Sequence, residues 1–276
     1  MLVDGHNLLW SATFGFPAPI YSRNKTRPLT GLFAFLALLR VAIRDDMPGA
    51  VPEVIVVFDG EHGGASRQQI HEGYKASRPA DDQALLPLTF LPDIKRGLDH
   101  CGIIWIELEH AEADDVIATV VHATPAPRPV IIMSRDKDYY QLITDRVTVL
   151  NTRFHAGHKL VTPQEVYRRH QVTPAQWADY RALAEDPADE IPGVHGIGAK
   201  TAATLLDGGL TLDELPSSGR LATGRPRAVA EQCELALKWR DMIRLDASLE
   251  LSRWPTGETS PQLPRPAKVV EQLGLW

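Results

Sequence analysis

The sequence has only two cysteines among 276 residues, Cys101 and Cys233, which lie far apart and outside any paired cysteine motif. This scarcity excludes a zinc ribbon and argues against a disulfide framework, and it is typical of a reducing cytoplasm. Long apolar runs are also missing. The most apolar stretch, Leu32 to Ile43, contains Arg40 and begins well inside the chain, so it predicts neither a membrane span nor a signal peptide. We expect a cytoplasmic protein with no membrane partner.

An excess of positive charge is absent too. There are 29 Lys and Arg residues against 35 Asp and Glu residues, a formal net charge of −6. Taken alone, this balance argues against nucleic acid as a partner, because phosphate binding favours a basic field. The 44% apolar and 23% charged residues are close to the average of globular proteins, which excludes disorder and coiled coil as descriptions of the whole chain.

Short β-branched runs alternate with longer amphipathic segments in the first part of the chain. This pattern predicts an α/β fold with a mostly parallel central sheet wrapped by helices. The expected strands are Leu2–Val3, Glu53–Phe58, Gly102–Glu107, Arg128–Met133 and Val147–Leu150. The expected helices between them are Leu29–Asp45, Leu88–Cys101 and Ala113–Ala123.

Strand signals end near residue 162, which predicts one domain over 1–162 and a helical region over 163–276. The expected helices of the second region are Pro163–His170, Pro174–Ala184, Ala199–Leu206, Arg227–Leu245 and Lys268–Leu273. Within the first domain, the interval from Gly60 to Ala84 is polar and has almost nothing to bury, so it reads as a functional or mobile loop.

Acidic residues follow several of the predicted strands. Asp4 and Asp59 each end a strand, Asp136 and Asp138 follow another, and Glu112, Asp114 and Asp115 open a helix beyond a fourth. Any one of them alone is most simply a helix cap or a solvated turn. Because the carboxyl ends of parallel strands meet at one edge, the four groups together predict a divalent-metal site. All-oxygen ligands favour Mg²⁺ or Mn²⁺, and their number suggests two ions that clamp a phosphodiester.

A glycine-rich turn in the second region, Pro192 to Ala202, runs into a helix. Its Gly193, Gly196 and Gly198 allow close approach of backbone N–H groups to an anion, and Lys200 and Thr201 could add phosphate contacts. Such a turn is weak evidence on its own. The turn follows two further acids, Asp186 and Asp189. A metal ion bound by these acids and the backbone N–H groups of the turn would then contact the same strand of substrate.

Six ordered motifs together resemble those of the structure-specific 5′ nucleases, over nearly the whole chain. They are Val3-Asp4-Gly5-His6-Asn7, Val57-Phe58-Asp59-Gly60, Tyr74-Lys75-Ala76-Ser77-Arg78, Glu112-Ala113-Asp114-Asp115-Val116, Ser134-Arg135-Asp136-Lys137-Asp138 and Asp186-Pro187-Ala188-Asp189-Glu190-Ile191-Pro192-Gly193-Val194. The likeness is to the 5′-3′ exonuclease domain of bacterial DNA polymerase I and to stand-alone bacterial and bacteriophage flap endonucleases. With no polymerase region in the sequence, we expect a stand-alone member.

The resemblance implies a two-metal phosphodiesterase of the PIN-like 5′ nuclease fold with a helix–three-turn–helix element. It would cut DNA at 5′ flaps, nicks or single-stranded 5′ ends, with RNA primer–DNA hybrids as a further substrate, in primer removal and repair, as a monomer. All nine acids carry over as metal ligands: Asp4, Asp59, Glu112, Asp114, Asp115, Asp136, Asp138, Asp186 and Asp189. The hairpin would grip duplex DNA, with K⁺ held by the carbonyls of Val194 and Ile197.

The interval from Gly60 to Ala84 would then be the arch through which a 5′ end passes. The resemblance places Arg67, Lys75 and Arg78 at the scissile phosphate, where they could stabilise developing charge, and Tyr74 where it could stack on a base. Without the resemblance, a solvated loop and ordinary packing of Tyr74 would be preferred. Glu185 and Glu190 depart from the Gly and Asn usual in the last acid motif and make the site more negative.

Two other kinds of protein stay open. One is a non-catalytic DNA-junction binding protein of the same fold, and the other is a ribonuclease on a related fold. His6, His155, His158 and His195 form no ligand set and are expected on turns or at the surface, and Trp177 and Tyr180 are expected in the core. Outside the nine acids, basic residues outnumber acidic ones by three, so the net charge does not exclude a nucleic-acid partner.

Overall fold

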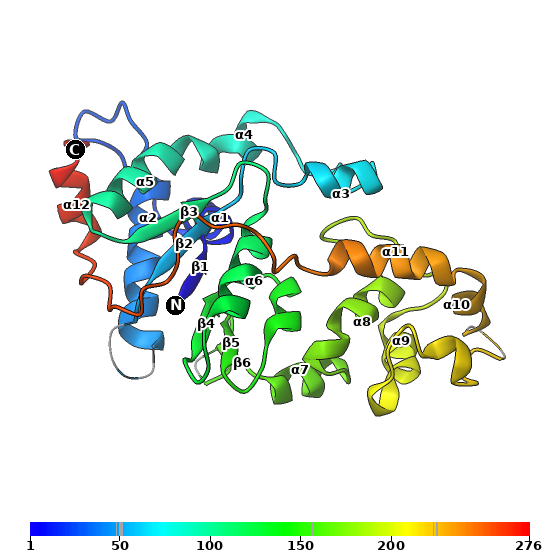
Figure 1. Ribbon diagram of the computed structural model, residues 1–276. Coiled ribbons are helices and arrows are strands. Elements are labelled where there is room, and N and C mark those ends of the chain that lie inside the picture. Colours follow the sequence, from blue (N-terminus) through cyan, green and yellow to red (C-terminus); the bar gives the residue numbers. More distant parts are fainter. Residues whose placement is uncertain (48, 50–51, 156, 223, 225) are drawn as a thin grey trace.

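Six short strands form one central sheet in the computed structural model, which describes residues 1–47, 49, 52–155, 157–222, 224 and 226–276 (Figure 1). The strand order is β3-β2-β1-β4-β5-β6, with β1 to β5 parallel and β6 antiparallel to β5. The strands are β1 (Leu2–Asp4), β2 (Ile55–Phe58), β3 (Ile104–Glu107), β4 (Val130–Met133), β5 (Val147–Leu150) and β6 (Leu160–Val161). The predicted mostly parallel sheet is confirmed, and the sixth strand was not predicted.

Helices cover both faces of the sheet because successive residues of each strand point to opposite sides. On β2, Val56 and Phe58 pack into one core, and Ile55 and Val57 pack into the other. The first core is completed by α1 (Gly5–Gly15), α2 (Thr30–Val41), α5 (Leu91–His100) and α12 (Pro266–Gln272). The second core begins with α6 (Ala113–Ala123).

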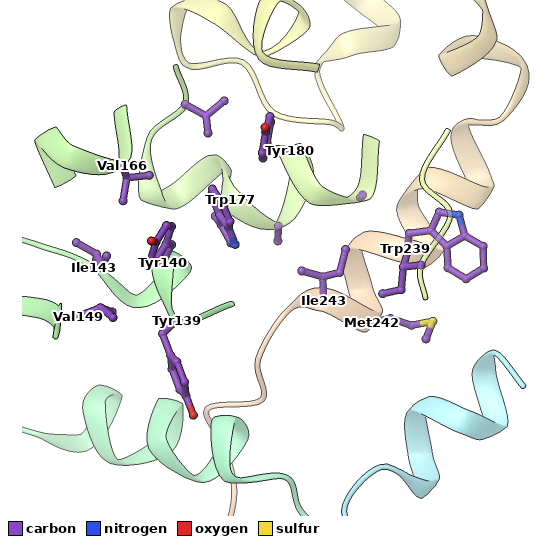
Figure 2. Packing of buried hydrophobic residues seen from close by; sticks show 14 of the residues in the cluster. Tyr139, Tyr140, Ile143, Val149, Val166, Trp177, Tyr180, Trp239, Met242 and Ile243 are labelled. Atoms are coloured by element: carbon purple, nitrogen blue, oxygen red, sulfur yellow. The ribbon is translucent and has the colours of Figure 1, made fainter. Parts of the chain in front are cut away.

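The second core continues without a break into the helical region. That region contains α7 (Pro163–His170), α8 (Trp177–Ala184), α9 (Ala199–Leu205), α10 (Arg227–Glu231) and α11 (Cys233–Ile243). Trp177 and Tyr180 are 0% and 5% exposed, so their expected place in the core is confirmed. Figure 2 shows them in one cluster with Tyr140 and Ile243. The sheet and the helical region therefore share one apolar core.

Three expectations about helices were wrong. The single helix expected over 227–245 is divided at Gln232, whose φ of −117° and ψ of 23° leave helical geometry. The interval 60–84 was expected to be a loop, yet it contains α3 (Ala65–Ile70) and reaches into α4 (Asp82–Leu85). Helix α1 was not predicted at all. It begins where the Asp4 carboxylate accepts the Asn7 N–H at 2.9 Å, which caps its first turn.

The segment after α11 returns to the sheet and ends in α12, which lies beside α2 in Figure 1. On the way, the backbone N–H groups of Thr256 and Gly257 donate to the buried Glu53 carboxylate at 2.7 and 3.2 Å. Arg128 also pairs with Glu53. The far end of the chain is thereby fixed to the amino-terminal edge of the sheet, opposite the edge where the strand-end acids lie.

Candidate active site

Three strand-end carboxylates meet at the carboxyl edge of the sheet. The strand order places β1 between β2 and β4, so Asp4, Asp59 and Asp136 follow neighbouring strands. All three line one cavity of about 540 Å³. Burial and the nearby charges of Asp59 and Asp136 raise the pKa of Asp4 to about 7. The expected convergence of strand-end acids is therefore present for this group.

Hydrogen bonds fix two of these carboxylates from the adjacent elements. Asp4 accepts from the hydroxyl of Ser134, which follows β4, at 2.9 Å, in addition to capping α1. Asp59 accepts the N–H of Ala113 at 2.7 Å, so the carboxylate after β2 caps the first turn of α6. Asp4 and Asp59 therefore both cap a helix and line the cavity.

The acids at the start of α6 have different surroundings. Glu112 and Asp114 line the cavity, while Asp115 points to Arg67. Burial alone would raise the pKa of Glu112, but the charges of Lys75 and Arg67 lower it to about 2. Burial raises the pKa of Asp114 well above its usual range against the opposing charge of Arg67. For Glu112 the nearby cations outweigh the effect of burial on the pKa, and for Asp114, with Arg67 Nη1 3.8 Å from its Oδ1, they do not.

Arg67 and Tyr74 do not face the cavity. Arg67 is buried, pairs with Glu112 and Asp115, and donates from Nε to the carbonyl of Met242 on α11 at 3.0 Å. Tyr74 is 1% exposed, and its hydroxyl donates to Glu112 at 2.9 Å. The ring has no free face in this structure, so base stacking by Tyr74 stays a prediction that requires the ring to leave its pocket.

Lys75 and Arg78 do line the cavity, and their place at the scissile phosphate stays a prediction. The ammonium of Lys75 contacts Glu112 and lies 3.7 Å from Asp189 Oδ1, and Arg78 Nη2 lies 3.2 Å from the same oxygen. Burial would lower the pKa of Lys75, but the carboxylates of Asp189 and Glu112 raise it above its usual value. Both basic side chains therefore lie at the wall of the cavity and contact the Asp189 carboxylate.

Asp138, Asp186 and Asp189 form a second group outside the cavity wall. Burial raises the pKa of Asp138 well above its usual range, and the charges of Asp136, Asp186 and Asp189 add to this. Asp186 is 2% exposed and pairs with Arg181, whose Nε lies 3.1 Å from Oδ2. Within the described part of the chain, no three acidic, histidine or cysteine side chains form a ready-made metal-binding group.

The glycine turn lines a separate surface groove of about 530 Å³. Gly193 and Gly196 have φ of 65° and 82°, and a Cβ at Gly193 would lie 2.4 Å from the backbone nitrogen of Glu185. Val194 and Ile197 are buried, and the Val194 carbonyl accepts the Ile197 N–H at 3.0 Å. Gly198 precedes α9, whose first turn carries Lys200 and Thr201.

Two family models together match nearly the whole chain. The model described as the 5′-3′ exonuclease N-terminal resolvase-like domain matches residues 1–171, and the one described as the 5′-3′ exonuclease C-terminal SAM fold matches residues 172–260. The chain belongs to the 5′-3′ exonuclease family. This confirms the predicted class of enzyme, a phosphodiester hydrolase, and the predicted resemblance. The two models meet at residue 171, so the boundary expected at 162 stays a prediction.

Relatives within the 5′-3′ exonuclease family are found in several bacteria. A 5′-3′ exonuclease of Aquifex aeolicus is 31% identical over 99% of this chain and 91% of its own length. The thermostable DNA polymerase I of Thermus thermophilus is 37% identical over 92% of this chain, which spans only 28% of that polymerase.

Solved structures share the fold of this family member. A structure of T5 5′-exonuclease with bound zinc has a TM-score of 0.66 at 23% identity and covers 89% of both chains. A bacteriophage T5 flap endonuclease in a complex with DNA and metal ions has the same TM-score at 22% identity, over 90% of this chain and 88% of that one. These likenesses support the fold expected from the sequence.

The contribution of α1 to this exonuclease-family site was not predicted from the sequence. His6, Asn7, Trp10 and Phe14 all line the cavity, and Phe14 is 50% exposed. His6 was expected on a turn or at the surface, which was wrong: its Nδ1 accepts the Asp59 N–H at 3.0 Å, and burial lowers its pKa against the nearby charge of Asp59. The i, i+4, i+8 spacing of His6, Trp10 and Phe14 was a signal for one helix face.

Within the described residues, no helix is long and apolar enough to cross a membrane, and both cysteines are free thiols.

Proposed function

We propose that this protein is a divalent-metal-dependent 5′-3′ exonuclease and structure-specific 5′ flap endonuclease that hydrolyses phosphodiester bonds of DNA. The proposal includes DNA with 5′ flaps, nicks or single-stranded 5′ ends as substrate, RNA primer–DNA hybrids as a further substrate, and a monomeric protein in the cytoplasm. The observation that supports this most directly is a single cavity lined by five carboxylates and two basic side chains. Asp4, Asp59, Glu112, Asp114 and Asp136 face it together with Lys75 and Arg78.

The donor chemistry of the site fits hard divalent cations. The cavity offers carboxylate oxygens in place of thiolates, and two of these carboxyls, Asp4 and Asp114, are held in surroundings that disfavour their charge and raise their pKa. Cations would remove that penalty. Metal ions are bound to the T5 relatives, which supports the same dependence here. We propose Mg²⁺ or Mn²⁺, two or more ions.

The proposed ligands fall into two sets. The first follows β1 and β2 and opens α6: Asp4, Asp59, Glu112, Asp114 and Asp115. The second follows β4 and precedes the hairpin: Asp136, Asp138, Asp186 and Asp189. Bound divalent ions would supply charge neutralisation to the phosphodiester and favour attack by water. For Asp115 and Asp186 to take part, their pairs with Arg67 and Arg181 have to open.

The protein's own side chains have distinct proposed roles. Lys75 and Arg78 bind the scissile phosphate and stabilise the charge that develops on it, because both already stand at the cavity wall. Trp10 and Phe14 offer an apolar surface against which a nucleotide base can pack. Arg67 is buried, so we propose that it holds the α6 carboxylates in place and does not itself contact the phosphate.

The hairpin is proposed to grip the duplex beside the cut. Its exposed Gly196 and Gly198 allow close approach of the DNA backbone, and Lys200 and Thr201 add side-chain contacts to phosphate. We extend the proposal to K⁺ held by the carbonyls of Val194 and Ile197. Binding of a catalytically blocked variant to duplex DNA should then be tighter in KCl than in NaCl of equal concentration, and equal affinities would reject the K⁺ site.

The function is tested with purified protein and a 5′-labelled DNA flap in Mn²⁺, in Mg²⁺ and with a chelator. Cleavage should need the metal, and Asp136→Asn should abolish it while binding to branched DNA persists. Asp145→Asn is the matched control, because Asp145 is exposed and lies outside the cavity. Unchanged cleavage by Asp136→Asn would reject the assignment. Binding without cleavage in either metal would favour the junction-binding protein, and preference for an RNA flap would favour the ribonuclease.

A further inference from the structure

A glutamate in the loop that carries the last two acids, residues 185–190 (the acid loop), is hydrogen-bonded to residues 75–78 of the 60–84 interval (the arch base). Glu190 Oε1 accepts both the backbone N–H and the hydroxyl of Ser77, each at 2.7 Å. Ser77 lies between Lys75 and Arg78, the two cations at the cavity wall. Hydrogen bonds to a carboxylate are shorter and stronger than those between neutral groups. One side chain of the acid loop therefore holds the segment that carries both cations.

A second set of contacts runs parallel to the first. The Lys75 N–H donates to the Asp189 carbonyl at 3.4 Å, and Arg78 donates to the Asp189 carboxylate at 3.2 Å. On each side of this contact one residue has left-handed backbone geometry, with φ of 55° at Lys75 and 59° at Glu190. Such conformations are uncommon for residues with a side chain and persist only where surrounding contacts impose them.

We propose that Glu190 is a positioning residue that clamps the arch base onto the acid loop and thereby holds Lys75 and Arg78 at the cavity. The role in catalysis rests on the proposed nuclease function. Glu190 does not line the cavity and acts through Ser77. Because Asp189 is its chain neighbour and faces both cations, the clamp sets the distance between the second acid group and the arch.

The same loop provides a matched control. Glu185 is an exposed glutamate that, like Glu190, has a positive φ, 89°, but its carboxylate makes no hydrogen bond or ion pair with any residue the structure describes. Replacing either residue by Asn removes one negative charge from the loop. Asn tolerates the left-handed geometry of position 190, and at position 185 it is no less strained than the Glu it replaces. Only the change at 190 removes the clamp, so loss of loop charge and loss of the clamp can be separated.

Limited trypsin digestion without DNA or metal measures the clamp directly. Trypsin can cut after Lys75, whereas Pro79 protects the bond after Arg78. The Lys75 side chain is only 15% exposed, so cutting requires the arch base to open. We expect Glu190→Asn to be cut there about fivefold faster than wild type, as expected for the loss of two hydrogen bonds at a partly exposed site. Glu185→Asn should match wild type.

Kinetics on a 5′ DNA flap test the positioning role. In Glu190→Asn we expect kcat to fall about fivefold with KM nearly unchanged, because Lys75 and Arg78 are displaced while the hairpin is untouched. Glu190→Gln keeps an acceptor oxygen for Ser77 and should restore both kcat and resistance to trypsin. Equal cutting of wild type and Glu190→Asn, or failure of Glu190→Gln to restore them, would overturn the clamp. A wild type that cuts no flap would overturn the proposed function, and the digestion would still decide the clamp.

Discussion

Arg67 and Asp115 form a two-pronged ion pair inside the protein, with Nη2 to Oδ1 and Nη1 to Oδ2 distances of 2.8 and 3.0 Å. The third nitrogen of the guanidinium, Nε, donates to the carbonyl of Met242. Figure 1 shows the consequence for the fold, because α3 of the arch lies beside α11. One arginine thus joins the arch, the acidic start of α6 and the helical region.

This geometry predicts that Arg67 contributes to stability. Arg67→Ala leaves the carboxylates of Asp115 and Glu112 buried beside each other, and breaking a buried pair from one side costs about 3–5 kcal/mol of unfolding free energy. Urea unfolding in a chelator measures it. Arg78→Ala is the control, because Arg78 is 59% exposed and should change stability by less than about 1 kcal/mol. Equal stability of the two variants would contradict the buried role of Arg67.

The sequence was sufficient for the parallel sheet because its strands are short, continuous apolar runs of the kind buried on both faces. It was not sufficient for α1, because the polar residues Ser11 and Thr13 interrupt the apolar pattern of this segment. In the structure their hydroxyls donate to the carbonyls of Asn7 and Leu9 within the helix. The arch helix α3 was missed for another reason. Its buried residue is Arg67, and no propensity indicates that an arginine will be covered by α11.

The sequence predicted where the acidic residues of the site lie in the fold better than it predicted which side chains contact one another. Strand-end placement brought Asp4, Asp59 and Asp136 together as expected, since strand order alone decides it. The burial of Arg67 and Tyr74 was not predictable, because it depends on how the 60–84 interval packs against α6 and α11. Which acids pair with arginines, as Asp186 does with Arg181, is likewise a property of tertiary packing.

Glu185 stores backbone strain directly before Asp186. Its φ of 89° with ψ of 152° belongs to a region that is essentially confined to glycine. Glu185→Gly should therefore raise the unfolding free energy by about 1 kcal/mol, the relief of strain less the extra flexibility of glycine in the unfolded chain. Thermal unfolding measures the change. Glu185→Ala keeps the strain and is the control, and a glycine variant less stable than this alanine variant would count against the interpretation.

His170 should make the free energy of unfolding depend on pH between about 4 and 6.5. Its ring packs 4.9 Å from Trp177, and burial, with the charges of Lys137, Arg169 and Arg181, lowers the pKa of the imidazole from 6.5 to about 4. Between these two pH values the unfolded chain binds a proton that the folded protein refuses, so stability falls as the pH drops from 6.5 to 4 and stays level below.

The variant His170→Phe removes this contribution. The difference in unfolding free energy between variant and wild type should shift by about 1–2 kcal/mol in favour of the variant on going from pH 7 to pH 4, after allowance for the ring's partial exposure. Because both proteins share all other titrating groups, the difference isolates the imidazole. Parallel pH profiles of the two proteins would show that His170 is protonated as easily in the folded state as in the unfolded one.

Above pH 3.8, Asp4 should destabilise the protein when no cation occupies the site. Its pKa is raised from 3.8 to about 7 by burial and by the charges of Asp59 and Asp136, so above pH 7 the folded state carries a charge that the unfolded state accommodates better. Asp4→Asn keeps an acceptor for the Asn7 N–H that begins α1. In a chelator at pH 8 this variant should be about 1–3 kcal/mol more stable than wild type, and the gain should shrink as the pH falls below 7 and vanish below 3.8.

Divalent metal should reverse that order. Mg²⁺ or Mn²⁺ that binds only the folded state raises the melting temperature of wild type with increasing concentration, and loss of one ligand weakens this effect in Asp4→Asn. Asp145→Asn should follow wild type with and without metal, because Asp145 lies outside the cavity. A variant that is less stable than wild type in the chelator, yet gains as much from the metal, would show that Asp4 serves as the cap of α1 and has no part in holding a cation.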